Sequence, residues 1–105
     1  RALALAREVN DVLAEAATWD SLGYAHHRLH ELDEAVRCYR EALPRYRESG
    51  DRYEEAATLE RLGDTHALAG DHAAAREVWQ AALAILEELG HGNVAALRAK
   101  AAGLP

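Results

Sequence analysis

Several residue types that most domains use are absent or nearly absent from this sequence. Its 105 residues include no phenylalanine, no methionine, one cysteine and two prolines. Because Cys38 is alone, an internal disulfide is excluded, and a reducing cytoplasm is the expected location. No stretch approaches the roughly 20 consecutive apolar residues of a membrane span, and no signal-peptide pattern opens the chain. We therefore expect a soluble protein that makes no membrane contact.

Positive charge is also scarce. The formal net charge is −6, and Lys100 is the only lysine among the 12 basic residues. A surface that binds nucleic acid needs clustered lysines and arginines, which replace counterions on the phosphates. The charge balance therefore argues against direct contact with nucleic acid. The sequence also opens inside a helical pattern without a start methionine, which favours a piece of a larger protein.

What the sequence does contain is an internal repeat. Residues 15–23 read EAATWDSLG and residues 55–63 read EAATLERLG, so six of nine positions are identical at an offset of forty. The same offset relates Tyr39 to Trp79 and His26 to His66. A fixed period of tens of residues indicates an architecture of stacked repeats, each of which is one small supersecondary unit.

Apolar residues within each copy recur every three or four positions, which predicts α-helices. The first copy predicts helices over about residues 11–29 and 32–49, and the second copy over about 52–69 and 72–89. The expected inward stripes of the first copy are Trp19, Leu22, His26 and Leu29, then Ala35, Tyr39, Ala42 and Tyr46. In the last of these helices the expected stripe is Ala75, Trp79, Ala82 and Leu86. Pro44 is expected to kink its helix without ending it.

Helix breaks are predicted where Asn10-Asp11, Gly50-Asp51 and Gly90-His91 recur at the same period. Glycine and asparagine tolerate the left-handed conformation that ends a helix, and aspartate caps the next one. We therefore divide the chain into the end of a preceding repeat (1–10), two repeats (11–50 and 51–90) and a capping helix (91–105). Asn93 is expected to cap that last helix, whose shared face is Val94, Leu97, Ala101 and Leu104.

Two glycines stand at equivalent places in the first helices of the two copies, Gly23 and Gly63. A glycine has no side chain, so an aromatic ring on the partner helix can approach its backbone closely. We expect the ring of Tyr39 to pack on Gly23 and the ring of Trp79 to pack on Gly63.

This pattern resembles the tetratricopeptide repeat. The matching positions are Trp19, Leu22, Gly23, Ala35, Tyr39 and Ala42 in the first copy, and Leu59, Leu62, Gly63, Gly70, Ala75, Trp79 and Ala82 in the second. The resemblance implies an all-α fold: a superhelix (solenoid) of antiparallel helix hairpins, with two full repeats, an N-terminal partial helix and a C-terminal capping helix.

The departures from the family pattern are specific. The period is forty where the family has 34, His26 and His66 replace a tyrosine, and His30 replaces the glycine of the turn. Forty-residue copies of this kind look like the arrays that follow the nucleotide-binding module in bacterial signal-transduction ATPases and antibiotic-regulatory transcription factors. The resemblance therefore implies a role in signal transduction or transcription regulation.

The resemblance also implies a scaffold that is not an enzyme and that binds a peptide or a neighbouring domain on its concave face, where the first helices lie. The candidate binding residues on that face are Asp20, Tyr24, His27, Arg28, Glu60, Arg61 and Asp64. Because Glu60 and Asp64 are like charges one turn apart, a basic partner would relieve their repulsion. The alternative is an acidic face that only contacts solvent.

Other chemistries receive less support. His26, His27 and His30 lie close in sequence, but zinc needs three or four converging ligands, so no metal or cofactor is expected. His26 and His66 are better explained as hydrogen-bonded core histidines. No set of nucleophile, base and acid emerges, so no catalytic residue is assigned. An alternative function is self-association into homo-oligomers, through exposed repeat edges or swapped terminal helices.

Overall fold

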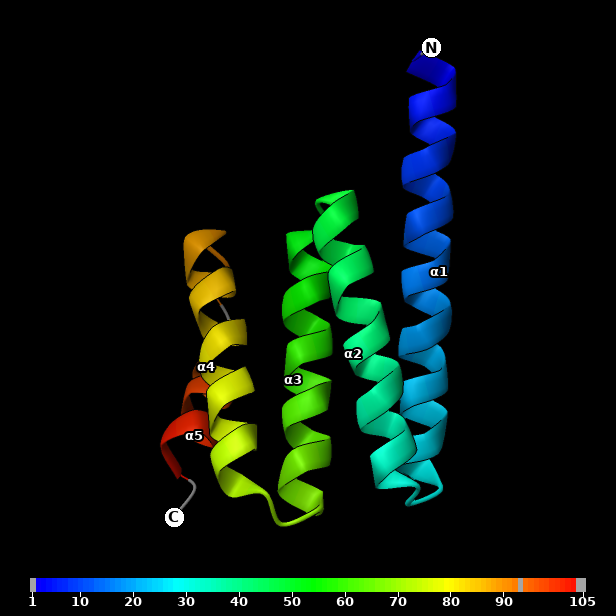
Figure 1. Cartoon of the computed structure of the whole chain (residues 1–105). Helices are drawn as coiled ribbons and strands as arrows, with labels where there is room; N and C mark the ends of the chain where they lie inside the picture. Colours follow the sequence, from blue (N-terminus) through cyan, green and yellow to red (C-terminus); the bar gives the residue numbers. More distant parts are fainter. Residues whose placement is uncertain (1, 93, 104–105) are drawn as a thin grey trace.

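The computed structural model describes residues 2–92 and 94–103, with side chains from Arg7 onward. Over these residues the regular structure is helical throughout. The helices are α1 (Ala2–Arg28), α2 (Leu32–Ser49), α3 (Arg52–Leu68), α4 (His72–Glu88) and α5 (Ala95–Gly103). They form two antiparallel hairpins, α1–α2 and α3–α4, that stack through α2 and α3, and α5 packs on α4 (Figure 1). The expected all-α stack of hairpins is confirmed.

The helix ends follow local chemistry. The carboxylates of Asp51 and Asp71 accept hydrogen bonds from the backbone N–H groups of Glu54 (3.0 Å) and Ala74 (3.2 Å), and so cap α3 and α4. The turn between α1 and α2 passes through His30 with φ 60°, where the second copy has Gly70 with φ 86°. The first turn therefore keeps the left-handed conformation although its residue carries a side chain.

The core lies where the two helices of each hairpin face each other. The stripe predicted for α2 is buried throughout, and α2 continues past Pro44 to Ser49. On α4 the prediction needs one correction, because Ile85 is buried and Leu86 is only partly buried. On the last helix Leu97 and Ala101 are buried, as is Val94 just before it, whereas Asn93 and Leu104 lie outside the described residues.

The two glycines lie against aromatic rings, as predicted. A Cβ atom placed on Gly23 would come within 2.7 Å of Tyr39 Cε1, and one placed on Gly63 within 2.2 Å of Trp79 Nε1. The Trp79 indole also donates a hydrogen bond to the Glu60 carbonyl (3.1 Å), which fixes the ring against α3. Each hairpin is therefore closed by the same ring-on-glycine contact.

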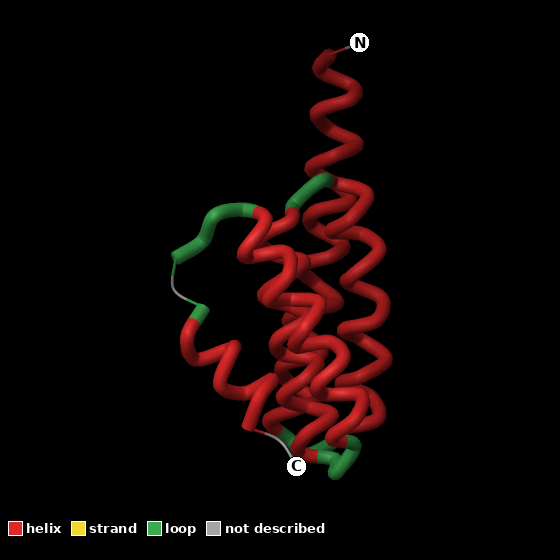
Figure 2. Tube along the Cα trace, turned by 90° about the vertical axis from the view of Figure 1, so that its left-hand side faces the viewer, coloured by secondary structure: helices red, strands yellow, loops and turns green. Residues whose placement is uncertain are grey.

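The predicted helix break at Asn10-Asp11 is wrong. α1 runs unbroken through both residues, and its N-terminal part projects beyond the other helices (Figures 1 and 2). At the equivalent places Gly50 and Gly90 adopt left-handed φ angles of 79° and 70°. The left-handed conformation costs Asn10 steric energy because asparagine has a side chain, whereas glycine adopts it freely. The continuous helix is therefore the more stable arrangement at this position.

The stripe predicted for α1 is also partly wrong. Leu22 and Leu29 expose 43% and 69% of their surface, whereas Leu62, the counterpart of Leu22, exposes 3%. The difference arises because α3 lies between two neighbouring helices, α2 and α4, while α1 packs mainly on α2. From Arg7 onward, the buried residues of α1 at its contact with α2 are Ala16 and Gly23.

Candidate binding face

The candidate residues lie on the surface formed by α1, α3 and α5, which we call the first-helix face. Asp20 stands where α1 meets α3, and its side chain is only 13% exposed. Its Oδ2 atom accepts hydrogen bonds from Arg61 Nη1 (2.9 Å), Thr58 Oγ1 (3.3 Å) and the Tyr46 hydroxyl (3.3 Å). Burial is the main reason that the pKa of Tyr46 lies above its usual value, and the Asp20 carboxylate is the second. The phenol therefore stays protonated and remains a donor. Asp20 therefore ties the two hairpins together.

A second carboxylate cluster joins α3 to α5. Lys100 Nζ donates to Glu60 Oε2 (2.8 Å) and to Asp64 Oδ1 (3.0 Å), and it lies 5.9 Å from the centre of the Trp79 ring. Burial alone would lower the pKa of Lys100, but its hydrogen bonds to the two carboxylates outweigh this and raise the pKa. The repulsion expected between Glu60 and Asp64 is thus relieved within the chain. The contact therefore weakens the reason for which the sequence favoured a basic partner, although one amine offsets only one of the two carboxylates.

The remaining candidates differ in how far their side chains are exposed and in whether they bond to other residues of the chain. His27 Nδ1 lies 2.7 Å from Thr65 Oγ1 and so links α1 to α3. Arg28 donates to the Tyr24 hydroxyl (3.3 Å), with its guanidinium 5.8 Å from the ring centre. Tyr24 is nevertheless 51% exposed. Of the predicted set, Tyr24 and Arg28 are therefore the residues with large exposed side chains, and Tyr24 is the one that offers an exposed phenol ring.

Two shallow grooves open on the first-helix face. One is lined by Asp20, Ser21, Tyr24 and Arg61. The other is lined by Tyr53, Ala57, Glu60, Leu86 and His91. In the second groove the rings of Tyr53 and His91 lie 5.4 Å apart at 38°.

The sequence reasoning missed Tyr53 and His91. Tyr53 precedes Ala57 by four positions and Glu60 by seven, which places all three on one helix face, so the helical period could have identified it. His91 carries no such signal, because it belongs to the segment between α4 and α5 and reaches Tyr53 only through the tertiary fold.

The histidines do not assemble a metal site within the described part of the chain. His26 Nδ1 lies 2.9 Å from Glu31 Oε1 and is partly exposed, whereas His66 is buried. The pKa of His66 is lowered mainly by burial and secondly by the positive charge of the nearby Arg40. Cys38 is buried too, and burial raises the pKa of its thiol, which disfavours the reactive thiolate. No described helix is both long and apolar enough to cross a bilayer.

Comparison with known proteins agrees with this architecture. A family model described as "Tetratricopeptide repeat" matches residues 13–88, which run from the middle of α1 to the end of α4. Neither the curated proteins nor the solved structures yield a match to the chain.

Proposed function

Because the chain belongs to the tetratricopeptide-repeat family, whose repeats generally mediate contacts between proteins, we propose that its first-helix face holds a peptide segment or a neighbouring domain. The expected setting is a larger cytoplasmic regulatory protein that acts in signal transduction or transcription regulation. The proposed contact residues are Asp20, Tyr24, His27, Arg28, Glu60, Arg61 and Asp64, to which Tyr53 is now added.

The exposure of Tyr24 is the observation that carries this proposal. Its ring borders the groove that also contains Ser21 and the Asp20–Arg61 ion pair. A half-exposed tyrosine offers a large apolar contact area with a polar end, the combination that dominates the energetics of many protein interfaces. Thr58 and Tyr46 hold the Asp20 carboxylate at the base of this groove, so the polar groups are already oriented before a partner arrives.

Glu60 and Asp64 are paired with Lys100, so they do not attract a basic partner as strongly as unpaired carboxylates would. Lys100 offsets one of the two negative charges of Glu60 and Asp64, so a basic partner side chain competes with that amine for the two carboxylates. A peptide that places an apolar side chain on Tyr24 and a lysine or arginine near α5 satisfies both ends of the face. We expect the apolar contact to supply most of the affinity and the basic contact to supply specificity.

The test starts from a random peptide library displayed on phage and selected on the immobilised 105-residue chain. Dissociation constants of selected peptides are then measured by fluorescence polarisation against Tyr24→Ala, Tyr24→Phe and a control, Arg37→Ala. Arg37 is exposed on the second helix α2, away from the face. We expect Tyr24→Ala to weaken binding about tenfold or more while the control changes nothing. Equal affinity for wild type and Tyr24→Ala would exclude this face as the binding surface.

Lys100→Ala tests the acidic part of the proposal separately. Removal of the amine leaves Glu60 and Asp64 unpaired, so peptides that contain lysine or arginine should bind more tightly than they bind to wild type. Adding Glu60→Gln and Asp64→Asn to this variant should remove the gain. If Lys100→Ala leaves the affinity of basic peptides unchanged, the two carboxylates serve only to anchor α5.

A further inference from the structure

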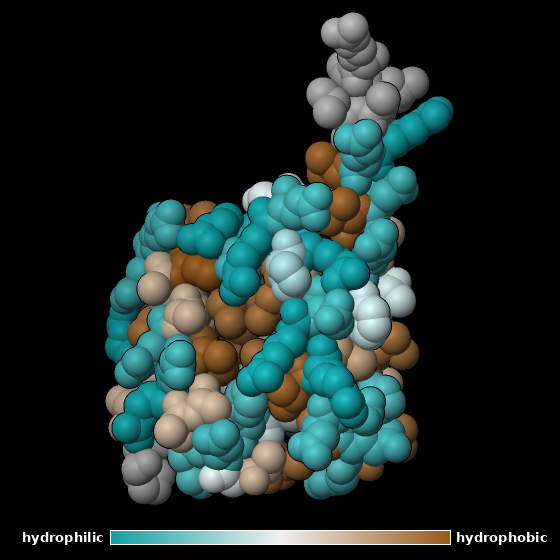
Figure 3. All heavy atoms as spheres, in the orientation of Figure 1, coloured by the Kyte–Doolittle hydropathy of each residue, from teal (hydrophilic) through white to brown (hydrophobic). Residues whose placement is uncertain are grey.

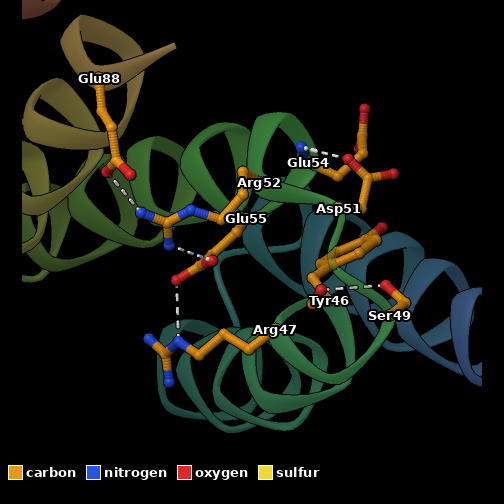
Figure 4. Close-up of polar contacts among 8 residues, drawn as sticks. All are labelled: Tyr46, Arg47, Ser49, Asp51, Arg52, Glu54, Glu55 and Glu88. Atoms are coloured by element: carbon orange, nitrogen blue, oxygen red, sulfur yellow. Dashed lines mark hydrogen bonds and ion pairs between the residues drawn. The ribbon is translucent and has the colours of Figure 1, made fainter.

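The junction between α2 and α3 shows how one repeat is closed onto the next. Arg47, near the end of α2, donates from Nε to Glu55 Oε2 on α3 (2.8 Å). Glu55 is only 3% exposed and also accepts from Arg52 Nη1 (3.0 Å) (Figure 4). Arg47 and Glu55 stand four residues before and after Asp51, so their contact is the signature of a helix hairpin that turns at Gly50-Asp51.

The same pair stands forty residues earlier as Arg7 and Glu15, four residues before and after Asp11. There, however, α1 does not turn. Residues eight apart on one continuous helix are separated by ~12 Å along its axis, so these two side chains cannot meet within a chain. Arg7, Asp11 and Glu15 instead follow one another at intervals of four along a single face of the helix.

We propose that this face binds a second copy of the chain, and that two α1 helices pack antiparallel about Asp11. In that arrangement Arg7 of each copy meets Glu15 of the other, so the contact that closes the α2–α3 junction is made between chains instead of within one. This is the exchange of an identical element that gives domain-swapped dimers at low cost. The proposal concerns a different surface from the first-helix face and does not rest on partner binding there.

The shape of the molecule accommodates this pairing. The N-terminal part of α1 stands clear of α2 to α5 (Figure 1). From Arg7 onward, where its side chains are described, this part of the molecule shows both hydrophilic and hydrophobic residues (Figure 3). Antiparallel helices centred on Asp11 overlap from Ala2 to Asp20 of α1, and beyond this overlap the two helical stacks extend in opposite directions. The Oε2 atom of Glu15 accepts a hydrogen bond from Arg45 Nε of α2 (3.0 Å), and the Glu15 side chain is 61% exposed. Its counterpart Glu55 is buried and accepts from two arginines, so Glu15 in the free copy leaves room for a second arginine.

Charge complementarity favours this two-fold arrangement over open stacking of copies. In a head-to-tail stack, α1 of one copy would take the place of α5 against α4 of the next. Glu15 would then face Glu87, because Glu87 stands forty residues after Arg47. Like charges would replace the attractive pair, and α5 would lose the contact between Arg98 and Glu87 (2.8 Å). The two-fold pairing instead matches each Glu15 with an arginine. The two Asp11 side chains meet at the axis, where each lies four residues from Arg7 of its own helix, and that basic side chain offsets their repulsion.

The proposal is tested by sedimentation equilibrium of the 105-residue chain from about 5 µM to 1 mM. We expect wild type to form a reversible dimer. Arg7→Glu should raise the dissociation constant of this dimer at least tenfold, and the double variant Arg7→Glu/Glu15→Arg should restore the wild-type value. Arg37→Glu makes the same change in net charge on α2 and should associate like wild type. A monomer at every concentration, or equal effects of Arg7→Glu and Arg37→Glu, would overturn the proposal. Circular dichroism establishes that each variant keeps its helical content.

Cross-linking tests the register of the two helices. In a Cys38→Val background, chosen because Val78 is the counterpart of Cys38, Asp11→Cys places the new thiols next to each other at the two-fold axis. Ala25→Cys, also exposed on α1, lies outside the overlap. Mild oxidation should convert the first variant to a covalent dimer and leave the second monomeric. Equal yields from the two would exclude this register. Asn10→Gly, which restores the glycine of the other junctions, should shift the Asp11→Cys chain towards monomer.

Discussion

Replacement of the repeat-position glycines by alanine should have three different outcomes at three equivalent sites. Gly23, Gly63 and Gly103 are separated by forty residues; the first two lie inside α1 and α3, and Gly103 is the last residue of α5. An added methyl group would meet the Tyr39 ring at Gly23 and the Trp79 indole at Gly63, but no atom within 4 Å at Gly103. The three substitutions are chemically identical, so any difference between them reports the packing of the second helix on the first.

The magnitudes follow from the contacts. At Gly63 the methyl carbon would stand 2.2 Å from Trp79 Nε1 and 2.3 Å from Cδ1, so the ring must move and lose its hydrogen bond to the Glu60 carbonyl. Overpacking costs about 1–3 kcal/mol and the lost bond about 1 kcal/mol, against about 1 kcal/mol gained in helix propensity. Gly63→Ala should therefore lower the free energy of unfolding by about 1–3 kcal/mol.

At Gly23 the nearest ring atom would lie 2.7 Å away, so a smaller shift suffices and we expect a loss of about 1 kcal/mol. Gly103→Ala should be neutral or stabilising by up to about 1 kcal/mol, since only the helix propensity changes. The assay is urea unfolding followed by circular dichroism, with the slope of the transition compared among variants. Equal effects at all three positions, or a neutral Gly63→Ala, would refute the packing of Trp79 on α3.

Two further predictions concern histidines. The folded-state pKa of His66 lies below its ordinary value of 6.5, so the unfolded chain binds more protons below that pH and stability should fall as the pH drops from about 7.5 to about 5.5. His66→Gln should show a smaller fall in the urea midpoint over this range, and an unchanged fall would exclude His66 as its cause. His30→Gly should raise stability by about 0.5 kcal/mol, because relief of the left-handed side chain outweighs the added entropy of the unfolded glycine. A melting temperature equal to or below that of wild type would contradict this.

The sequence predicted the helices and the closing contacts of each hairpin because these depend on local signals. The helical period located α2, α3 and α4 to within a residue at their ends, and the pairing of Gly63 with Trp79 followed from the need for close approach. The break at Asn10 was wrong because asparagine permits a turn without requiring one. The exposure of Leu22 was missed because the repeat predicts a buried residue, whereas burial also needs a neighbouring helix.

The candidate face was only partly accessible to sequence reasoning. The helical period correctly brought Asp20 and Glu60 to the side where α1, α3 and α5 meet. It did not show that Arg61 and Lys100 neutralise them, because those pairs join residues 41 and 40 positions apart. The sequence favoured a basic partner that binds unpaired carboxylates. The structure favours a peptide that packs on Tyr24 and whose basic side chain competes with Lys100.

The most direct test of the repeated hairpin is a nuclear Overhauser spectrum of the labelled chain. Two equivalent contacts should be visible: the Hα protons of Gly23 near the Tyr39 ring, and those of Gly63 near the Trp79 indole. Both sets of glycine protons should be displaced by ring currents and should show cross-peaks to their rings. Glycine protons at random-coil positions, without cross-peaks to either ring, would contradict the account that one hairpin is built twice.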